Sequence, residues 1–174
     1  MNDQTPPDDS RQTSRSEASK HPVLNAPKIP FPPAIYPVSS IGGGYFLQRF
    51  IPLPQPSDTS FTIIGSVIFV ISILLLVWSI TTLRKFKTTT MPHHPAKYLV
   101  TTGPYRFSRN PIYLAFLLLT LASALATGNL WILLSLPVVM LTLAIYAVHP
   151  EESHLKQTFG DSYIEYSRKV RRWI

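Results

Sequence analysis

The sequence predicts an all-α integral membrane protein with about four transmembrane helices and an amphipathic helical tail at its C-terminal end. Three observations lead to this fold class. Hydrophobic residues make up 45% of the 174 residues and are gathered into blocks. Residues 61–83 carry no charged side chain, and such a stretch is long enough for a helix to cross a bilayer. The basic residues between 84 and 111 flank apolar blocks and have no acidic residue among them, a pattern typical of a loop that faces anionic lipid.

The first third of the chain has few signals of regular structure. Residues 1–30 are rich in Ser, Asp, Pro and Gln and lack an apolar period, so we expect a disordered tail. Residues 31–50 are nearly uncharged and just long enough to span a bilayer, but they contain three prolines and the run Gly42-Gly43-Gly44. We interpret them as a first transmembrane or re-entrant segment, so that the membrane domain covers residues 31–174.

Residues 61–83 form the clearest expected transmembrane helix. They are apolar on every side of a helix, and Trp78 and the pair Arg84-Lys85 mark one membrane interface. With four crossings, both termini and nearly all basic residues lie on the same side of the membrane. That side is expected to be cytoplasmic, in the inner membrane of a bacterium.

Two further spans are expected at residues 112–126 and 130–148. They are joined at Thr127-Gly128-Asn129, a turn short enough to require an antiparallel hairpin. Pro137 should bend the second of these helices.

Residues 97–113, KYLVTTGPYRFSRNPIY, form a basic and aromatic connector between two apolar stretches. Gly103-Pro104 is a turn signal, and Asn110-Pro111 is typical of a helix start with Asn as the N-cap. A helix N-terminus favours an anionic group through its free N–H groups and its dipole, so this connector could hold a cofactor. The alternative is that its Arg and Tyr side chains only anchor the chain at the membrane interface.

Residues 149–174 are predicted to leave the membrane as an amphipathic tail, with Pro150 at the start of a new helix. Glu152 should face water and pair with Lys156 four residues later. Glu151 points toward the apolar side, where a carboxylate without a partner is costly. Glu151 is therefore the better functional candidate of the two.

The pair Phe159-Gly160 should end this helix. Beyond it, Tyr163, Tyr166 and Trp173 recur at intervals that place them on one helix face. That spacing is more typical of interfacial packing than of chemistry.

Composition excludes several classes of site. The chain has no Cys, so it has no disulfide framework, thiol nucleophile or thiolate metal site. The five His residues lack the spacing of metal ligands, and no metal is expected. Because the positive charge is concentrated beside apolar stretches, it indicates membrane lipid rather than nucleic acid as the partner.

The connector and the tail together resemble the isoprenylcysteine carboxyl methyltransferase family of integral membrane enzymes, including its small bacterial members. The resemblance covers about residues 87–173 and includes the two-helix hairpin. It rests on the connector residues Leu99-Val100, Gly103-Pro104-Tyr105-Arg106 and Arg109-Asn110-Pro111 with Tyr113, and on the tail residues Glu151-Glu152 with Leu155 and Phe159-Gly160 with Tyr163, Tyr166 and Val170. The ordered set at this spacing is specific, although each piece alone is not.

The resemblance implies transfer of a methyl group from S-adenosylmethionine to a lipophilic acceptor at the cytoplasmic membrane face. The acceptor would be a small molecule or a lipid-anchored group that enters from the bilayer. Position by position, the implied cofactor-binding residues are Lys97, Tyr98, Leu99, Val100, Tyr105, Asn110, Pro111, Ile112, Tyr113 and Glu151.

We infer detailed roles for these residues from their chemistry. Glu151 would face amino or hydroxyl groups of the cofactor, Tyr105 and Tyr113 would frame its rings, and Arg109 or the helix N-terminus would suit its carboxylate. A sulfonium already carries a good leaving group, so no general base is required. No catalytic residue is assigned from the sequence, and Arg109 is a candidate.

Two positions depart from the family pattern, and two other functions compete with methyl transfer. Asn110 stands where the family has His, and Ala147 stands where the eukaryotic enzymes have an Arg associated with the substrate. The loss of that Arg argues against a prenylcysteine carboxylate as acceptor. The alternatives are an NADPH-dependent membrane reductase on a related scaffold and a non-catalytic membrane scaffold protein.

Overall fold

The computed structural model describes residues 31–55, 58–86 and 98–174, so the expected disordered tail and Lys97 lie outside the described residues. All regular structure in the described residues is helical, which confirms the predicted all-α class. In chain order the elements are α2 (Ile35–Phe50), α3 (Thr59–Lys85), the 3-10 turn η1 (Gly103–Arg106), α4 (Pro111–Thr127), α5 (Leu130–Leu143), the π-helical turn η2 (Ala144–Val148), α6 (His149–Phe159) and α7 (Asp161–Lys169).

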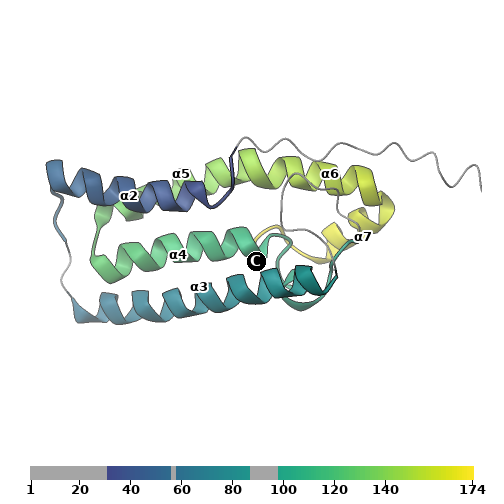
Figure 1. The fold of residues 1–174 in the computed structure, drawn as a ribbon, viewed down its shortest axis with the longest axis horizontal. Coiled ribbons are helices and arrows are strands. Elements are labelled where there is room, and N and C mark those ends of the chain that lie inside the picture. The colour runs from purple at the N-terminus through teal and green to yellow at the C-terminus, as the bar shows by residue number, and fades with distance from the viewer. Residues whose placement is uncertain (1–30, 56–57, 87–97) are drawn as a thin grey trace, which may run out of the picture.

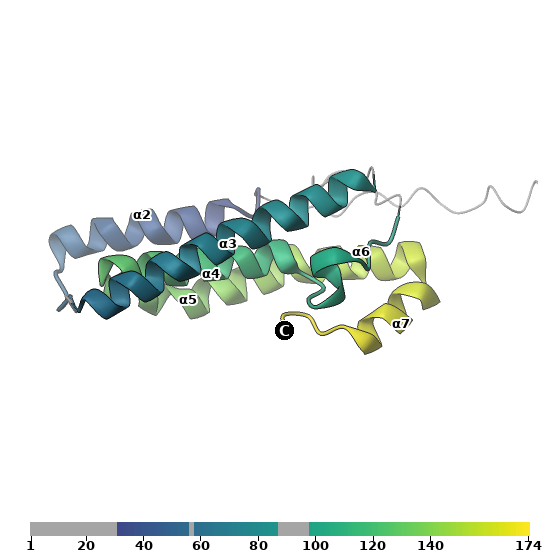
Figure 2. The ribbon, with the colours of Figure 1, turned by 90° about the horizontal axis from the view of Figure 1, so that it is seen from below.

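The long helices run antiparallel in one elongated bundle (Figure 1). α3 packs along α4 and α2 along α5. Figure 2, from a second direction, shows α3 crossing in front of α4. The loop after α2 and the turn after α4 lie at one end of the bundle (Figure 1). The connector before α4 meets α6 and α7 at the other end, and the candidate site is built there.

Small residues allow α3 and α4 to pack closely. Gly65, Ser72 and Ser79 recur every seven residues along α3 and are buried. A Cβ atom at Gly65 would lie 2.5 Å from the backbone nitrogen of Ala126 on α4. In lipid, two apolar helices gain no hydrophobic energy from each other, so close contact between small residues is what favours their association.

The first expected span is a helix, but it begins at Ile35 and not at residue 31. Pro37 lies in its first turn, where a helix tolerates proline because the missing N–H would have no partner there. Gly44 lies directly against α5: a Cβ atom there would come 2.4 Å from Cγ1 of Ile132. The run Gly42-Gly43-Gly44 counted against a helix in the sequence. The structure shows that Gly44 is needed for the close packing of α2 on α5.

The hairpin turn between α4 and α5 confirms the prediction at Thr127-Gly128-Asn129. Gly128 takes the left-handed conformation with φ +62° and ends α4. The Asn129 side chain accepts hydrogen bonds from the backbone N–H groups of Trp131 and Ile132, and it donates to the Gly44 carbonyl oxygen at 3.3 Å. One residue thus caps α5 and fixes α2 against it.

α5 continues through η2 into α6, so the expected new helix start at Pro150 is wrong. The backbone N–H of His149 bonds to the Ala144 carbonyl five residues earlier, which widens the turn. Because proline has no N–H and its ring clashes with the carbonyl four residues back, the widened turn allows the helix to pass Pro150. Pro137 also lies inside α5.

Two helices are long and apolar enough to cross a membrane, namely α3 and the continuous helix Leu130–Phe159. Only 17% of the most apolar stretch of the first and 28% of that of the second are buried inside the protein. A core helix of a soluble protein would be mostly buried, so these surfaces indicate a lipid environment. α4 is apolar but shorter, and α2 has 16 residues, so the structure does not confirm the expected four spans.

Replacing Gly44 by Ala should lower thermal stability, and Gly43→Ala is the matched control on the same helix. Nothing lies within 4 Å of a Cβ atom at Gly43, so Ala there should stabilise α2 by up to about 1 kcal/mol. Ala at position 44 gains the same propensity but overpacks against Ile132, which costs about 1 to 3 kcal/mol. Thermal unfolding in detergent measures the difference. A Gly44→Ala melting temperature equal to that of Gly43→Ala would contradict the close α2–α5 contact.

Candidate functional site

The connector turns sharply at Gly103 and packs on the end of α3. Gly103 has φ +61°, and a Cβ atom there would lie 3.0 Å from the Thr82 hydroxyl oxygen. The turn η1 then buries Tyr105, whose carbonyl oxygen accepts a hydrogen bond from the Tyr166 hydroxyl at 2.6 Å. Tyr166 was expected to serve in interfacial packing, but it ties α7 to the connector.

Asn110 precedes α4 as predicted, but its side chain does not cap the helix. The amide nitrogen instead donates to the Glu152 carboxylate at 3.4 Å and to the Arg172 carbonyl oxygen at 3.2 Å. Both acceptors come from the C-terminal part of the chain, which the local pattern around Asn110 could not reveal. The predicted capping bond of Asn110 is therefore wrong, while the helix start at Pro111 is confirmed.

The segment after α7 crosses the connector and is hydrogen-bonded to it. The Arg109 backbone N–H donates to the Arg171 carbonyl oxygen at 3.0 Å, and the Ser108 hydroxyl donates to that of Arg172 at 3.3 Å. Trp173 packs against a buried cluster that includes Tyr113 on α4. The C-terminal segment thus covers the start of α4, and Figure 1 shows the chain end there.

Glu152 binds the connector to the C-terminal segment. Its carboxylate accepts from the Arg172 guanidinium at 2.7 and 3.2 Å and lies 3.5 Å from a terminal nitrogen of Arg109. Only 12% of its side chain is exposed. The prediction that Glu152 faces water and pairs with Lys156 is therefore wrong, because the tail folds back and brings Arg172 to it.

Glu151 accepts a hydrogen bond from the Tyr113 hydroxyl at 2.8 Å. Tyr113 is buried on α4 and belongs to the hydrophobic cluster with Leu143 and Ala147. The bond therefore joins the N-terminal end of α4 to α6 beside the core. It involves one carboxylate oxygen, and the other has no hydrogen-bond partner among the described residues.

Tyr105 lies close to this pair. Burial raises the pKa of its phenol, and the negative charge of Glu151 raises it further. The hydroxyl group is therefore protonated at neutral pH and can donate. Within the described part of the chain it has no hydrogen-bond partner.

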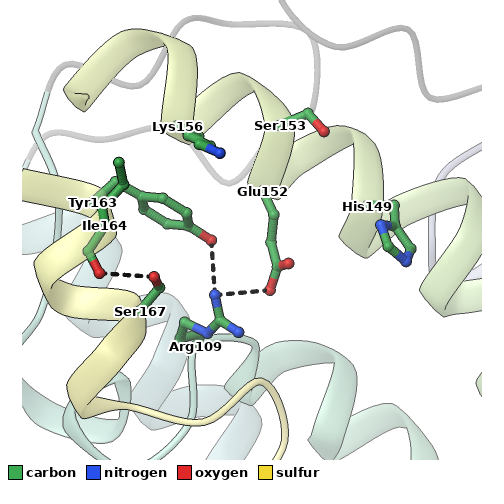
Figure 3. A pocket seen from close by; sticks show the side chains of 8 residues that line it. All are labelled: Arg109, His149, Glu152, Ser153, Lys156, Tyr163, Ile164 and Ser167. Carbon is green, nitrogen blue, oxygen red and sulfur yellow. Dashed lines mark hydrogen bonds and ion pairs between the residues drawn. The ribbon is translucent and has the colours of Figure 1, made fainter. Parts of the chain in front are cut away.

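A cavity of about 320 Å³ lies between α6, α7 and the connector (Figure 3). It is lined by Arg109 of the connector, by His149, Glu152, Ser153 and Lys156 of α6, and by Tyr163, Ile164 and Ser167 of α7. The Arg109 guanidinium donates to the Tyr163 hydroxyl at 3.3 Å, and Figure 3 shows it between Tyr163 and Glu152. The implied cofactor-binding residues do not line this cavity, whereas Arg109, the catalytic candidate, does.

The implied cofactor-binding residues differ in how the structure places them. Tyr98 is 60% exposed, whereas Val100 is buried. Leu99, Ile112 and Glu151 are half-buried, and Tyr105, Asn110, Pro111 and Tyr113 are buried. Within the described residues, one side-chain hydrogen bond connects members of this set, and it joins Tyr113 to Glu151.

Sequence reasoning missed the part of the site made by Glu152, Tyr163 and Arg172. Arg172 lies in a basic run that follows the acidic pair, and this was the available signal. The pairing itself depends on the chain reversing at Gly160, where φ is +52°, and then crossing the connector. The spacing of residues along the sequence does not predict this course of the C-terminal segment.

The fold and the site define a helical membrane protein with a charged site at the end of its bundle. The family of phospholipid methyltransferases matches residues 61–162, which is more than half of the chain. The chain therefore belongs to the phospholipid and isoprenylcysteine carboxyl methyltransferase family, as its resemblance predicted.

Individual relatives match shorter stretches. An uncharacterized protein of Haemophilus influenzae is 38% identical over 63 residues, which cover 36% of this chain and all of that protein. Protein-S-isoprenylcysteine O-methyltransferase of Schizosaccharomyces pombe is 35% identical over 72 residues, 41% of this chain and 30% of that enzyme. Protein-S-isoprenylcysteine O-methyltransferase B of Arabidopsis thaliana is 33% identical over 78 residues, 45% of this chain and 38% of that enzyme. The chain thus matches about a third of the length of the two named enzymes, and no solved structure matches it.

Replacing Arg172 by Gln should loosen the C-terminal segment. The Arg172 side chain is 35% exposed and the Glu152 side chain 12%. The loss of folding stability should therefore lie between that for an exposed and that for a buried ion pair, at about 1 to 2 kcal/mol. Hydrogen exchange of the Arg109 backbone N–H should speed up, because its acceptor Arg171 lies in the released segment. Mass spectrometry of the connector peptide and thermal melting measure both effects.

Lys169→Gln is the control for this change, because it breaks an exposed pair with Glu165 on α7. It should cost only a few tenths of a kcal/mol and leave exchange in the connector unchanged. Equal exchange in the Arg172 and Lys169 variants would show that the Glu152 pair does not hold the segment.

Proposed function

We propose that this protein transfers a methyl group from S-adenosylmethionine to a lipophilic acceptor at the cytoplasmic face of the membrane. The observation that carries the proposal is the hydrogen bond between Tyr113 and Glu151, two of the implied cofactor-binding residues. It joins the connector end of α4 to α6 within the residues that the family matches. The two related enzymes of Schizosaccharomyces pombe and Arabidopsis thaliana give further support, because both are O-methyltransferases.

The residues at this end of the bundle fit such a cofactor. The free oxygen of Glu151 can accept from an amino or hydroxyl group, and its charge suits a cation. The Tyr105 hydroxyl is a protonated donor without a partner among the described residues. The first turn of α4 begins with Pro111 and offers free N–H groups to a carboxylate.

Bound S-adenosylmethionine supplies a sulfonium methyl group whose departure leaves a neutral thioether. The chain's part is to bind and orient. Glu151 would be held in place by Tyr113, which is fixed in the core cluster, so its carboxylate is ready before the ligand arrives. The C-terminal segment would exclude water, because Trp173 packs on the same cluster.

The proposed acceptor is lipophilic and reaches the site from the bilayer. Ala147 is fully buried in the core cluster with Tyr113 and Leu143, so the position where the eukaryotic enzymes have an Arg offers an apolar wall here. An apolar wall cannot select a carboxylate. The membrane domain would cover residues 31–174, with cofactor-binding segments at 97–113 and 149–174.

Replacing Glu151 by Gln should weaken cofactor binding by about 1.5 to 3 kcal/mol, the usual range for a hydrogen bond that involves a charged group. Glu165→Gln is the matched control, because Glu165 lies on α7 with 68% of its side chain exposed. Isothermal titration of detergent-purified protein with S-adenosylhomocysteine measures both, and thermal melting controls for folding. Equal affinities of the two variants would remove Glu151 from the cofactor site.

The same titration separates the proposal from its alternatives. The wild-type protein should bind S-adenosylhomocysteine and not NADPH. Preferential binding of NADPH would indicate a membrane reductase, and binding of neither would indicate a scaffold protein. A screen of membrane lipid extracts with labelled S-adenosylmethionine would then identify the acceptor.

The proposed orientation places α6 and α7 in the cytoplasm and the loop after α2 outside it. Because the chain has no Cys, single cysteines can report on each side. A cysteine at Gln55 should react with an impermeant maleimide added to intact cells, and one at Ser162 on α7 should react only after the cells are opened. Labelling of Ser162→Cys but not of Gln55→Cys in intact cells would invert the orientation.

A further inference from the structure

The cavity beside Arg109 is lined by more positive than negative side chains. Among the residues of the described chain that line it, Glu152 is the one carboxylate, and the two oxygens of Glu152 already accept from Arg172 and Asn110. Arg172 neutralises that carboxylate without lining the cavity. Arg109, Arg172 and Lys156 are therefore three cations beside the single carboxylate of Glu152, and this cluster has a net charge of +2.

The Arg109 guanidinium is only partly satisfied. Its contacts to Tyr163 and Glu152 are 3.3 and 3.5 Å, which is long for hydrogen bonds of a charged donor, and both use the same terminal nitrogen. Its Nε is buried and has no hydrogen-bond partner among the residues that the structure describes. Its second terminal nitrogen has none among the described residues either. A buried guanidinium in this state favours an additional acceptor.

Lys156 reaches the same cavity from α6. It was expected to pair with Glu152, but within the described residues it forms no ion pair. Figure 3 shows its amino group on the side of the cavity opposite Arg109. The two cations thus stand on facing walls.

Hydroxyl groups complete the lining. The Tyr163 oxygen accepts from Arg109, so its own proton is available to donate. Burial raises the pKa of this phenol, so the proton is retained at neutral pH. Ser153 also lines the cavity and has no partner among the described residues.

We propose that the cavity between Arg109, Lys156 and Tyr163 is a binding site for a phosphate group. A tetrahedral phosphate offers several acceptor oxygens and up to two negative charges, which match the net charge of +2 and the hydroxyl donors around the cavity. A single carboxylate carries one negative charge and would balance only one of the cations Arg109 and Lys156. The site goes beyond the proposed methyl transfer, because Glu151 and the other implied cofactor-binding residues do not line it, although Arg109, the catalytic candidate, does.

The experiment measures phosphate binding to the full chain purified in detergent. Isothermal titration with inorganic phosphate tests the free anion, and native mass spectrometry with dioleoyl phosphatidic acid tests the same group on a lipid. The variants are Lys156→Gln and Tyr163→Phe, with Lys169→Gln as the control that removes a lysine from α7 outside the cavity. S-adenosylhomocysteine affinity is measured on the same samples.

We expect saturable binding of at least one probe that weakens about tenfold in Lys156→Gln, as for one lost charged hydrogen bond, and that is unchanged in Lys169→Gln. Tyr163→Phe should also weaken it. The probe that binds identifies the source, a free phosphate or a lipid headgroup. S-adenosylhomocysteine affinity should stay unchanged in Lys156→Gln, so a failure of the cofactor proposal remains separate. Equal binding in the Lys156 and Lys169 variants, or no saturable binding of either probe, would overturn the site.

Discussion

The end of the bundle depends on the buried carboxylate of Glu152. A carboxylate with 12% exposure is costly unless donors surround it, and here Arg172, Arg109 and Asn110 do so. These donors come from the C-terminal segment and from the connector, which are distant in sequence. Satisfying one charge therefore requires both to be in place. The hydrogen bonds of Ser108 and Arg109 to the same segment then follow from its position.

The helices of the bundle are held in another way. α3 presents most of its apolar side chains outward. It meets Ala122 and Ala126 of α4 at Gly65, and Ser72 and Ser79 are buried on the same helix. The two serine hydroxyls bond to carbonyl oxygens of their own helix, so they cost nothing at the interface. Such packing positions the helices without a large apolar core, which is the arrangement that a lipid solvent allows. The charged residues Arg109, Glu152 and Arg172 lie together at one end of this bundle.

Local features of the fold could be predicted from the sequence, and long-range ones could not. The helix start at Pro111, the turn at Gly128 and the helix end at Phe159 follow from proline and glycine, whose backbone constraints act on their neighbours. The continuous helix through Pro150 could not be foreseen, because a π-helical turn at Ala144–Val148 has no reliable sequence signal. For the candidate site, the family pattern gathers Tyr113 and Glu151, but the partners of Glu152 depend on the returning C-terminal segment.

The adjacent acids Glu151 and Glu152 have separate surroundings. Successive residues on a helix point about 100° apart, so one α6 turn can present a carboxylate to two environments. Glu152 is enclosed by Arg172 and Asn110 and keeps no free oxygen, which suits a structural role. Glu151 is held by one neutral donor and keeps one oxygen without a partner among the described residues, which suits a ligand. The sequence analysis singled out Glu151 for its expected burial, whereas the proposed function rests on its hydrogen bond with Tyr113 and on its second oxygen. Glu152 is the more strongly bound of the two, and its ion pair with Arg172 joins α6 to the C-terminal segment.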